Sequence, residues 1–174
     1  MVLVFEDFAI ELLLFAIPLY VSNAVPVLIG GMTPIDFGKN FVDGKRLFGD
    51  GKTFRGFAIG VLAGWGVALL TQYCLLNFTQ FPVPQTLFFG LFVAFGALFG
   101  DLVGSFAKRR IGIKKGEPVF LLDQLDFVAG GIIFGSFFYI PSFWGIVFIA
   151  SATLILHRAT NVIAFKMKLK KVPW

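Results

Sequence analysis

Three carboxylates and several cations recur in one stretch of the chain at spacings that could support chemistry. Asp101, Ser105 and Lys108 stand at positions i, i+4 and i+7, so on a helix they share one face. Asp123 and Asp126, at positions i and i+3, share a face of a following helix. Oxygen ligands without a cluster of His or Cys favour Mg²⁺ over zinc. The spacing therefore predicts a magnesium site at the three aspartates.

The same aspartates have a purely structural interpretation. A carboxylate in or near the hydrocarbon of a bilayer is costly unless it is paired or bound to a metal. Salt bridges to Lys108, Arg109 or Lys114 would satisfy that requirement without any metal. From the residues alone, the metal site and the ion pairs remain alternatives.

A second cluster, DGKRLFGDGKTFRG at residues 43–56, combines glycines with cations. A glycine-rich turn that enters a helix leaves free N–H groups at the positive end of the helix dipole, where an anion binds well. We expect Thr53 to be the N-cap, with Arg46, Lys52 and Arg55 adding positive charge. The segment is not a Walker P-loop, because Arg46 stands where that motif needs glycine. A capped helix start without a ligand is the alternative.

The segments that must position these residues are strongly apolar. Of 174 residues, 57% are hydrophobic and 14% are charged, with a mean hydropathy of +0.86, whereas soluble domains are about 25% charged. We therefore expect an all-α, polytopic membrane protein that forms one domain over residues 1–174. The net charge of +5 does not indicate a nucleic-acid partner, because the cations lie between apolar segments, as topology signals and anion ligands do.

Five segments are long enough to cross a bilayer core of ~30 Å, which needs about 20 apolar residues. The expected transmembrane helices are residues 8–31, 54–76, 85–108, 120–139 and 143–165. We expect the first to be broken at Pro18, Asn23 and Pro26. All 15 Lys and Arg residues then fall on one side. The positive-inside rule places the amino terminus outside, the carboxyl terminus in the cytoplasm and the site on the cytoplasmic face of the cell membrane.

Two features of the apolar segments bear on the site. Gly96, Gly100 and Gly104 recur at helical spacing, which lets helix backbones approach closely in lipid. Such packing would hold Asp101 near its neighbours. Asn23 brings an amide into the first segment, where flanking prolines open the backbone ladder. Its partner is either a ligand or a neighbouring carbonyl.

The stretch from residue 100 to 126 resembles the signature of the CDP-diacylglycerol synthase superfamily, the membrane phosphatidate cytidylyltransferases. That signature reads S-x-x-K-R-x4-K-D and then D-R-x-D, and the matching residues are Ser105, Lys108, Arg109, Lys114, Asp123 and Asp126, with Asp101 at an upstream family aspartate. Lys115 replaces the signature Asp, Gln124 replaces the Arg, and the family's His-Gly-Gly is absent. Residues 49–56 also form a Gly-Asp-Gly-Lys-Thr-x-Arg-Gly motif. With this motif and these departures, the sequence resembles the archaeal branch of the superfamily, the CDP-archaeol synthases.

The resemblance implies that a lipid phosphate, unsaturated archaetidic acid, attacks the α-phosphorus of CTP. Pyrophosphate leaves, and CDP-archaeol forms for polar lipid synthesis. Asp101, Asp123, Asp126 and Lys52 would be catalytic, with Mg²⁺ as cofactor. The residues expected to bind substrate are Asn23, Arg46, Asp50, Lys52, Thr53, Arg55, Ser105, Lys108 and Lys114. The partners implied are CTP, an isoprenoid glycerophosphate lipid and membrane lipids, and a homodimer is left open.

Several other functions remain open from the sequence. A CTP-dependent polyprenol kinase would leave CDP instead of pyrophosphate, and a phosphatidate cytidylyltransferase would act on a different lipid. A small ion or solute transporter would need ionisable groups near the middle of the bilayer or inverted repeats. A scaffold that binds anionic lipids would need the basic loops but none of the three aspartates.

Overall fold

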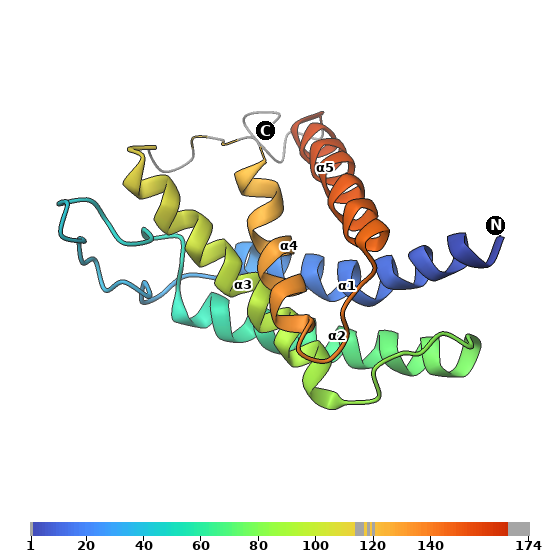
Figure 1. The fold of residues 1–174 in the computed structure, drawn as a ribbon. Coiled ribbons are helices and arrows are strands. Elements are labelled where there is room, and N and C mark those ends of the chain that lie inside the picture. The colour runs from blue at the N-terminus through green and yellow to red at the C-terminus, as the bar shows by residue number, and fades with distance from the viewer. Residues whose placement is uncertain (1, 114–116, 118, 120, 167–174) are drawn as a thin grey trace.

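The computed structural model describes residues 2–113, 117, 119 and 121–166, which fold into five helices (Figure 1). These are α1 (Val2–Ile29), α2 (Phe54–Phe78), α3 (Leu87–Arg110), α4 (Leu122–Gly135) and α5 (Phe143–Lys166). The described residues form no β-strand, only isolated bridges between Pro34 and Thr53 and between Asn40 and Arg46. The expectation of an all-α chain with five helices is therefore confirmed.

Three of the five helices are long and apolar enough to cross a membrane. They cover Asp7–Ile29, Phe54–Phe78 and Leu87–Arg110. Helix α4 has only 14 residues, about 21 Å at 1.5 Å per residue, and so it is shorter than the span expected at 120–139. In α5 the apolar part is Phe143–Ala159. That all five helices cross the bilayer, and which side each terminus faces, stays a prediction.

The expected break in the first helix is wrong. Helix α1 runs through both Pro18 and Pro26 without interruption. A proline removes one backbone donor, and such positions are tolerated where neighbouring side chains and helices satisfy the backbone. Between the two prolines, the Ser22 hydroxyl donates to the carbonyl of Pro18 at 2.7 Å, within the helix itself. Helix α2 packs closely on this turn, because a Cβ at Gly64 would lie only 1.8 Å from Ser22 Oγ.

The core lies where α3 meets its neighbours. Helix α3 packs mainly on α4 and α2, while α1 packs along α2 (Figure 1). Buried apolar side chains from four helices meet here, including Phe15 and Leu19 of α1, Phe89 and Val93 of α3, Phe127 of α4 and Ile149 of α5. The connection between α1 and α2, residues 30–53, lies at the same end of the bundle as the carboxyl end of α3. This arrangement brings the two charged stretches together.

Candidate active site

Asp36 organises the loop between α1 and α2. The residue is 4% exposed, and its carboxylate accepts hydrogen bonds from the Arg46 guanidinium at 2.7 and 3.2 Å. It also accepts the backbone N–H groups of Gly38, Phe48 and Gly49. Burial alone would raise the pKa of Asp36, but these hydrogen bonds outweigh it and hold the pKa well below its ordinary value. Sequence reasoning missed this residue. The Asp36-x-Gly38 spacing, typical of an Asx-turn, is the only local signal for it.

Replacing Asp36 by Asn is expected to destabilise the protein at neutral pH. The variant loses charge-assisted hydrogen bonds and one ion pair of Arg46, at a cost of about 2 kcal/mol. Because the folded pKa lies below the ordinary value, the contribution is complete above about pH 3.9 and disappears as the pH falls through the folded pKa. Thermal unfolding in detergent at pH 7 and along an acid series measures both effects.

Asp50→Asn is the matched control for that measurement. Asp50 pairs with the same Arg46 at 2.7 Å, but its side chain is 61% exposed, so its loss should change stability by less than ~1 kcal/mol. Equal losses of stability in the two variants would show that Asp36 has no special role in the loop.

The expectation that Thr53 caps α2 is confirmed. Its hydroxyl accepts the N–H of Gly56 at 3.2 Å and also the N–H of Gly31 at 3.2 Å. The backbone around it is held as well, with Ile35 N–H donating to the Lys52 carbonyl at 2.8 Å. The amino end of α2 is thereby fixed to the segment that follows α1. Lys52, one residue before the cap, is held in a defined position.

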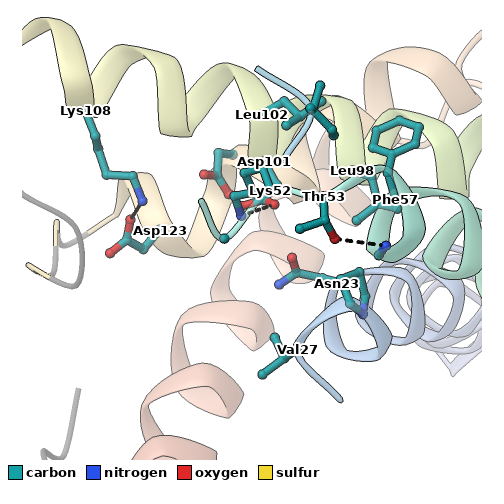
Figure 2. A pocket seen from close by; sticks show the side chains of 15 residues that line it. Asn23, Val27, Lys52, Thr53, Phe57, Leu98, Asp101, Leu102, Lys108 and Asp123 are labelled. Atoms are coloured by element: carbon teal, nitrogen blue, oxygen red, sulfur yellow. Dashed lines mark hydrogen bonds and ion pairs between the residues drawn. The ribbon is translucent and has the colours of Figure 1, made fainter. Parts of the chain in front are cut away.

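A cavity of about 280 Å³ lies between the carboxyl end of α1, the loop and helices α2 to α4. One part of its lining is polar and consists of Asn23, Lys52, Thr53, Asp101, Lys108, Asp123 and Asp126. The other part is apolar and includes Pro26, Val27, Ile35, Phe57, Leu98 and Leu102. Figure 2 shows the ion-paired side chains and the apolar ones around the same space. The cavity therefore combines charged groups, two lysines and three carboxylates, with apolar side chains in a single lining.

Two ion pairs cross the polar part of this cavity (Figure 2). Lys52 pairs with Asp101, and Lys108 pairs with Asp123. The Asp123 carboxylate also accepts the N–H of Val119 at 2.9 Å. The pairing of Asp123 with Lys108 is one of the salt bridges considered above, whereas Lys52 was not considered as a partner for Asp101. The pairs hold both carboxylates and both ammonium groups at the cavity.

Asp126 differs from the other two aspartates. Its Oδ1 accepts the N–H of Phe127 at 2.6 Å, but its Oδ2 is buried and has no hydrogen-bond partner in the described part of the chain. A buried carboxylate oxygen without a partner is costly. Helix α3 lies directly against it, because a Cβ at Gly104 would come within 2.1 Å of Oδ2. The close helix packing expected from the glycine spacing is thus observed at this position.

The donor chemistry of the cavity fits a hard divalent cation. The three carboxylates line one cavity, the donors are oxygens, and one buried oxygen lacks a partner. As they stand, no three His, Cys, Asp or Glu side chains of the described residues meet closely enough to enclose a metal.

The remaining residues expected at the site are dispersed. Arg46 and Asp50 line a neighbouring cavity. Arg55 is exposed, and its guanidinium lies 3.9 Å from the sulfur of Met32. Ser105 is 3% exposed on α3 and lines neither cavity. Lys114 lies outside the described residues.

Arg110 links the loop between α1 and α2 to the carboxyl end of α3. Its guanidinium pairs with Asp43 and donates to the carbonyls of Lys45 and Arg46. It also lies 4.7 Å from the ring centre of Phe106. Arg110 therefore keeps the two charged stretches in contact.

Comparison with known proteins gives one consistent result. The family described as CarS-like, CDP-archaeol synthase, matches residues 5–174. The CDP-archaeol synthase of Archaeoglobus fulgidus is 43% identical, over 97% of this chain and 99% of its own, and that of Methanopyrus kandleri is 45% identical, over 92% and 90%. A solved structure described as an intramembrane enzyme for archaeal membrane lipids biosynthesis is 40% identical, with a TM-score of 0.77 over 88% of this chain and 92% of its own. The chain therefore belongs to the CDP-archaeol synthase family of membrane cytidylyltransferases.

Proposed function

We propose that the protein transfers the cytidylyl group of CTP to the phosphate of unsaturated archaetidic acid, giving CDP-archaeol and pyrophosphate. The observation that carries this proposal is the cavity whose ion-paired part adjoins an apolar part. A lipid phosphate is a substrate with both characters. Family membership supports the reaction class.

The lipid chains would lie along Val27, Phe57 and Leu98, with the phosphate at the polar part of the cavity. Lys52 and Lys108 now pair with carboxylates, and they would donate to phosphate oxygens when substrate enters. This exchange suits a phosphoryl displacement, which depends on positioning and on neutralising charge. Asn23 and Thr53 line the same space and would orient the substrate through their amide and hydroxyl groups.

Asp101, Asp123 and Asp126 would hold Mg²⁺. When bound there, the ion would neutralise negative charge on the phosphates and help to orient them. Arg46 and Asp50 line the neighbouring cavity instead, and a substrate contact for either stays a prediction. The substrate contacts expected for Arg55, Ser105 and Lys114 stay predictions.

We further propose that the cavity faces the cytoplasm. The loop of residues 30–53 and the carboxyl end of α3 lie at one end of the bundle (Figure 1). Lys108, Arg109 and Arg110 occupy the last turn of α3, and Lys39, Lys45, Arg46 and Lys52 lie in the loop. Clustered cations favour the cytoplasmic side of a membrane.

Turnover of labelled CTP tests the reaction. With full-length protein in detergent, Mg²⁺ and the lipid phosphate, we expect label from the α-phosphate to enter the lipid and pyrophosphate to appear in equal amount. The lipid alcohol that lacks the phosphate is the control and should give no product. Transfer of label from the γ-phosphate to that alcohol, with release of CDP, would instead identify a lipid kinase and contradict the proposal.

A further inference from the structure

A second cavity of about 330 Å³ lies beside the first, between the loop and the end of α3. It is lined by Lys45, Arg46, Gly49, Asp50, Arg109, Gly112 and Ile113. All but one of these residues belong to connecting segments, and the exception, Arg109, is in the last turn of α3. The cavity is therefore formed at the end of the bundle and not among the apolar stretches of the helices.

The lining of this cavity carries unbalanced positive charge. Arg46 is matched by the carboxylates of Asp36 and Asp50, each at 2.7 Å. Lys45 and Arg109 have no carboxylate within ion-pairing distance among the residues that the structure describes. The ammonium of Lys45 donates to the carbonyl of Arg110 at 2.9 Å. Arg109 donates to the carbonyl of Ile113. Two cations held in place by neutral acceptors leave a local excess of positive charge, which favours an anion.

Two glycines bring backbone close to these cations. Gly49 and Gly112 adopt φ angles of 106° and 85°, which glycine reaches without strain. A Cβ at Gly49 would lie 3.8 Å from Arg109 Nε, and one at Gly112 would lie 3.7 Å from Lys45 Nζ. Arg109, at the end of α3, therefore lies close to the backbone of the loop at Gly49. Lys45, in the loop, lies close to the backbone that follows α3 at Gly112. The loop and the end of α3 build the cavity jointly.

Residues that are adjacent in the chain line the two cavities. Gly49 and Asp50 line the second cavity, while Gly51 and Lys52 line the first. On α3, Lys108 lines the first cavity and its neighbour Arg109 lines the second. A polyphosphate chain held by Lys52 and Lys108 would thus extend towards Arg109, the residue that follows Lys108.

The in-line geometry of the reaction suggests a role for the second cavity, and this inference rests on the function proposed above. A new bond forms between a lipid phosphate oxygen and the α-phosphorus of CTP, and the bond from that phosphorus to the bridging oxygen breaks, with its electron pair leaving on pyrophosphate. Attacking and leaving oxygens lie roughly in line. On that function, the lipid would approach along the apolar part of the first cavity, and the in-line leaving group would point away from it. The second cavity, formed by the loop and the end of α3, would receive that leaving group. We propose that Lys45 and Arg109 bind the β- and γ-phosphates of CTP and release pyrophosphate through the second cavity.

Calorimetric binding of inorganic pyrophosphate, with Mg²⁺ and full-length protein in detergent, tests this subsite. We expect Arg109→Gln and Lys45→Gln each to weaken pyrophosphate binding about tenfold, as loss of one charged hydrogen-bond donor does. The control is Lys39→Gln, which removes the same charge from an exposed side chain of the same loop that lines neither cavity. It should leave binding unchanged. Because binding is read without turnover, its loss is distinguishable from failure of the proposed reaction.

Two outcomes would overturn the proposal. If Arg109→Gln and Lys45→Gln bind pyrophosphate as the wild type does but need more lipid phosphate for half-maximal rate, the cavity holds a lipid headgroup. If Lys39→Gln weakens pyrophosphate binding equally, only the overall positive charge of the loop matters. Thermal unfolding of each variant checks that it is folded, and having two variants keeps the test decisive if one is not.

Discussion

Asp126→Asn should abolish cytidylyl transfer while the protein keeps its fold. The substitution preserves shape, so the close contact of the side chain with Gly104 and the hydrogen bond from Phe127 N–H to Oδ1 both remain possible. It removes the negative charge and exchanges a ligand oxygen for an NH₂ group, which cannot hold a cation. Losing the charge stabilisation of a bound metal is worth several kcal/mol, and we expect kcat to fall roughly a thousandfold.

Asp43→Asn is the matched control for Asp126→Asn. Asp43 lies at the same end of the bundle and pairs with Arg110, but it lines neither cavity. Its activity should stay within about twofold of the wild type, as expected for a surface ion pair of small energy. Mg²⁺ should raise the melting temperature of the wild type and of Asp43→Asn, but not that of Asp126→Asn. Near-normal turnover in Asp126→Asn would eliminate the proposed metal site.

The helices could be anticipated because their signals are local. Thr53 precedes an apolar run and caps the helix that the run forms. The last turn of α3 contains Lys108, Arg109 and Arg110, and the helix dipole favours cations at this end. The length of α4 could not be anticipated in the same way. Residues 127–139 contain no charged residue and only Ser136 as a polar side chain apart from the Tyr139 hydroxyl, so hydropathy marks no carboxyl end for this helix. The helix begins after Leu121, whose φ of 71° is incompatible with a helix, and ends at Gly135.

The site could be anticipated only where its spacing is local. Asp101 and Lys108 share α3, Asp123 and Asp126 share α4, and all four line the first cavity. The partner of Asp101 could not be deduced, because Lys52 is 49 positions away in the chain and reaches α3 only through the tertiary packing of the loop. For the same reason the sequence did not identify Asp36, whose five hydrogen bonds exist only in the folded loop.

Gly104→Ala should inactivate the enzyme although it changes no charge. The new Cβ would lie 2.1 Å from Asp126 Oδ2 and 2.8 Å from Asp126 Cβ, so either α3 and α4 separate or the carboxylate turns away from the cavity. Overpacking of this kind costs about 1–3 kcal/mol of stability. A displacement of about 1 Å at a reacting centre costs about a hundredfold in rate. Formation of CDP-lipid and thermal unfolding, measured together, report both effects.

Two further glycine variants separate the position of Asp126 from helix packing in general. Gly66→Ala adds a methyl group to an exposed position of α2 with no atom within 4 Å, so stability and activity should match or slightly exceed those of the wild type. Gly96→Ala crowds the same α3–α4 contact, 2.5 Å from the carbonyl of Gly130, but about two helical turns from Gly104 along α3. It should lower the melting temperature as much as Gly104→Ala does, with a smaller loss of rate. If Gly104→Ala and Gly96→Ala lose the same fraction of their rate, activity depends on the α3–α4 contact as a whole and not on the position of the Asp126 carboxylate.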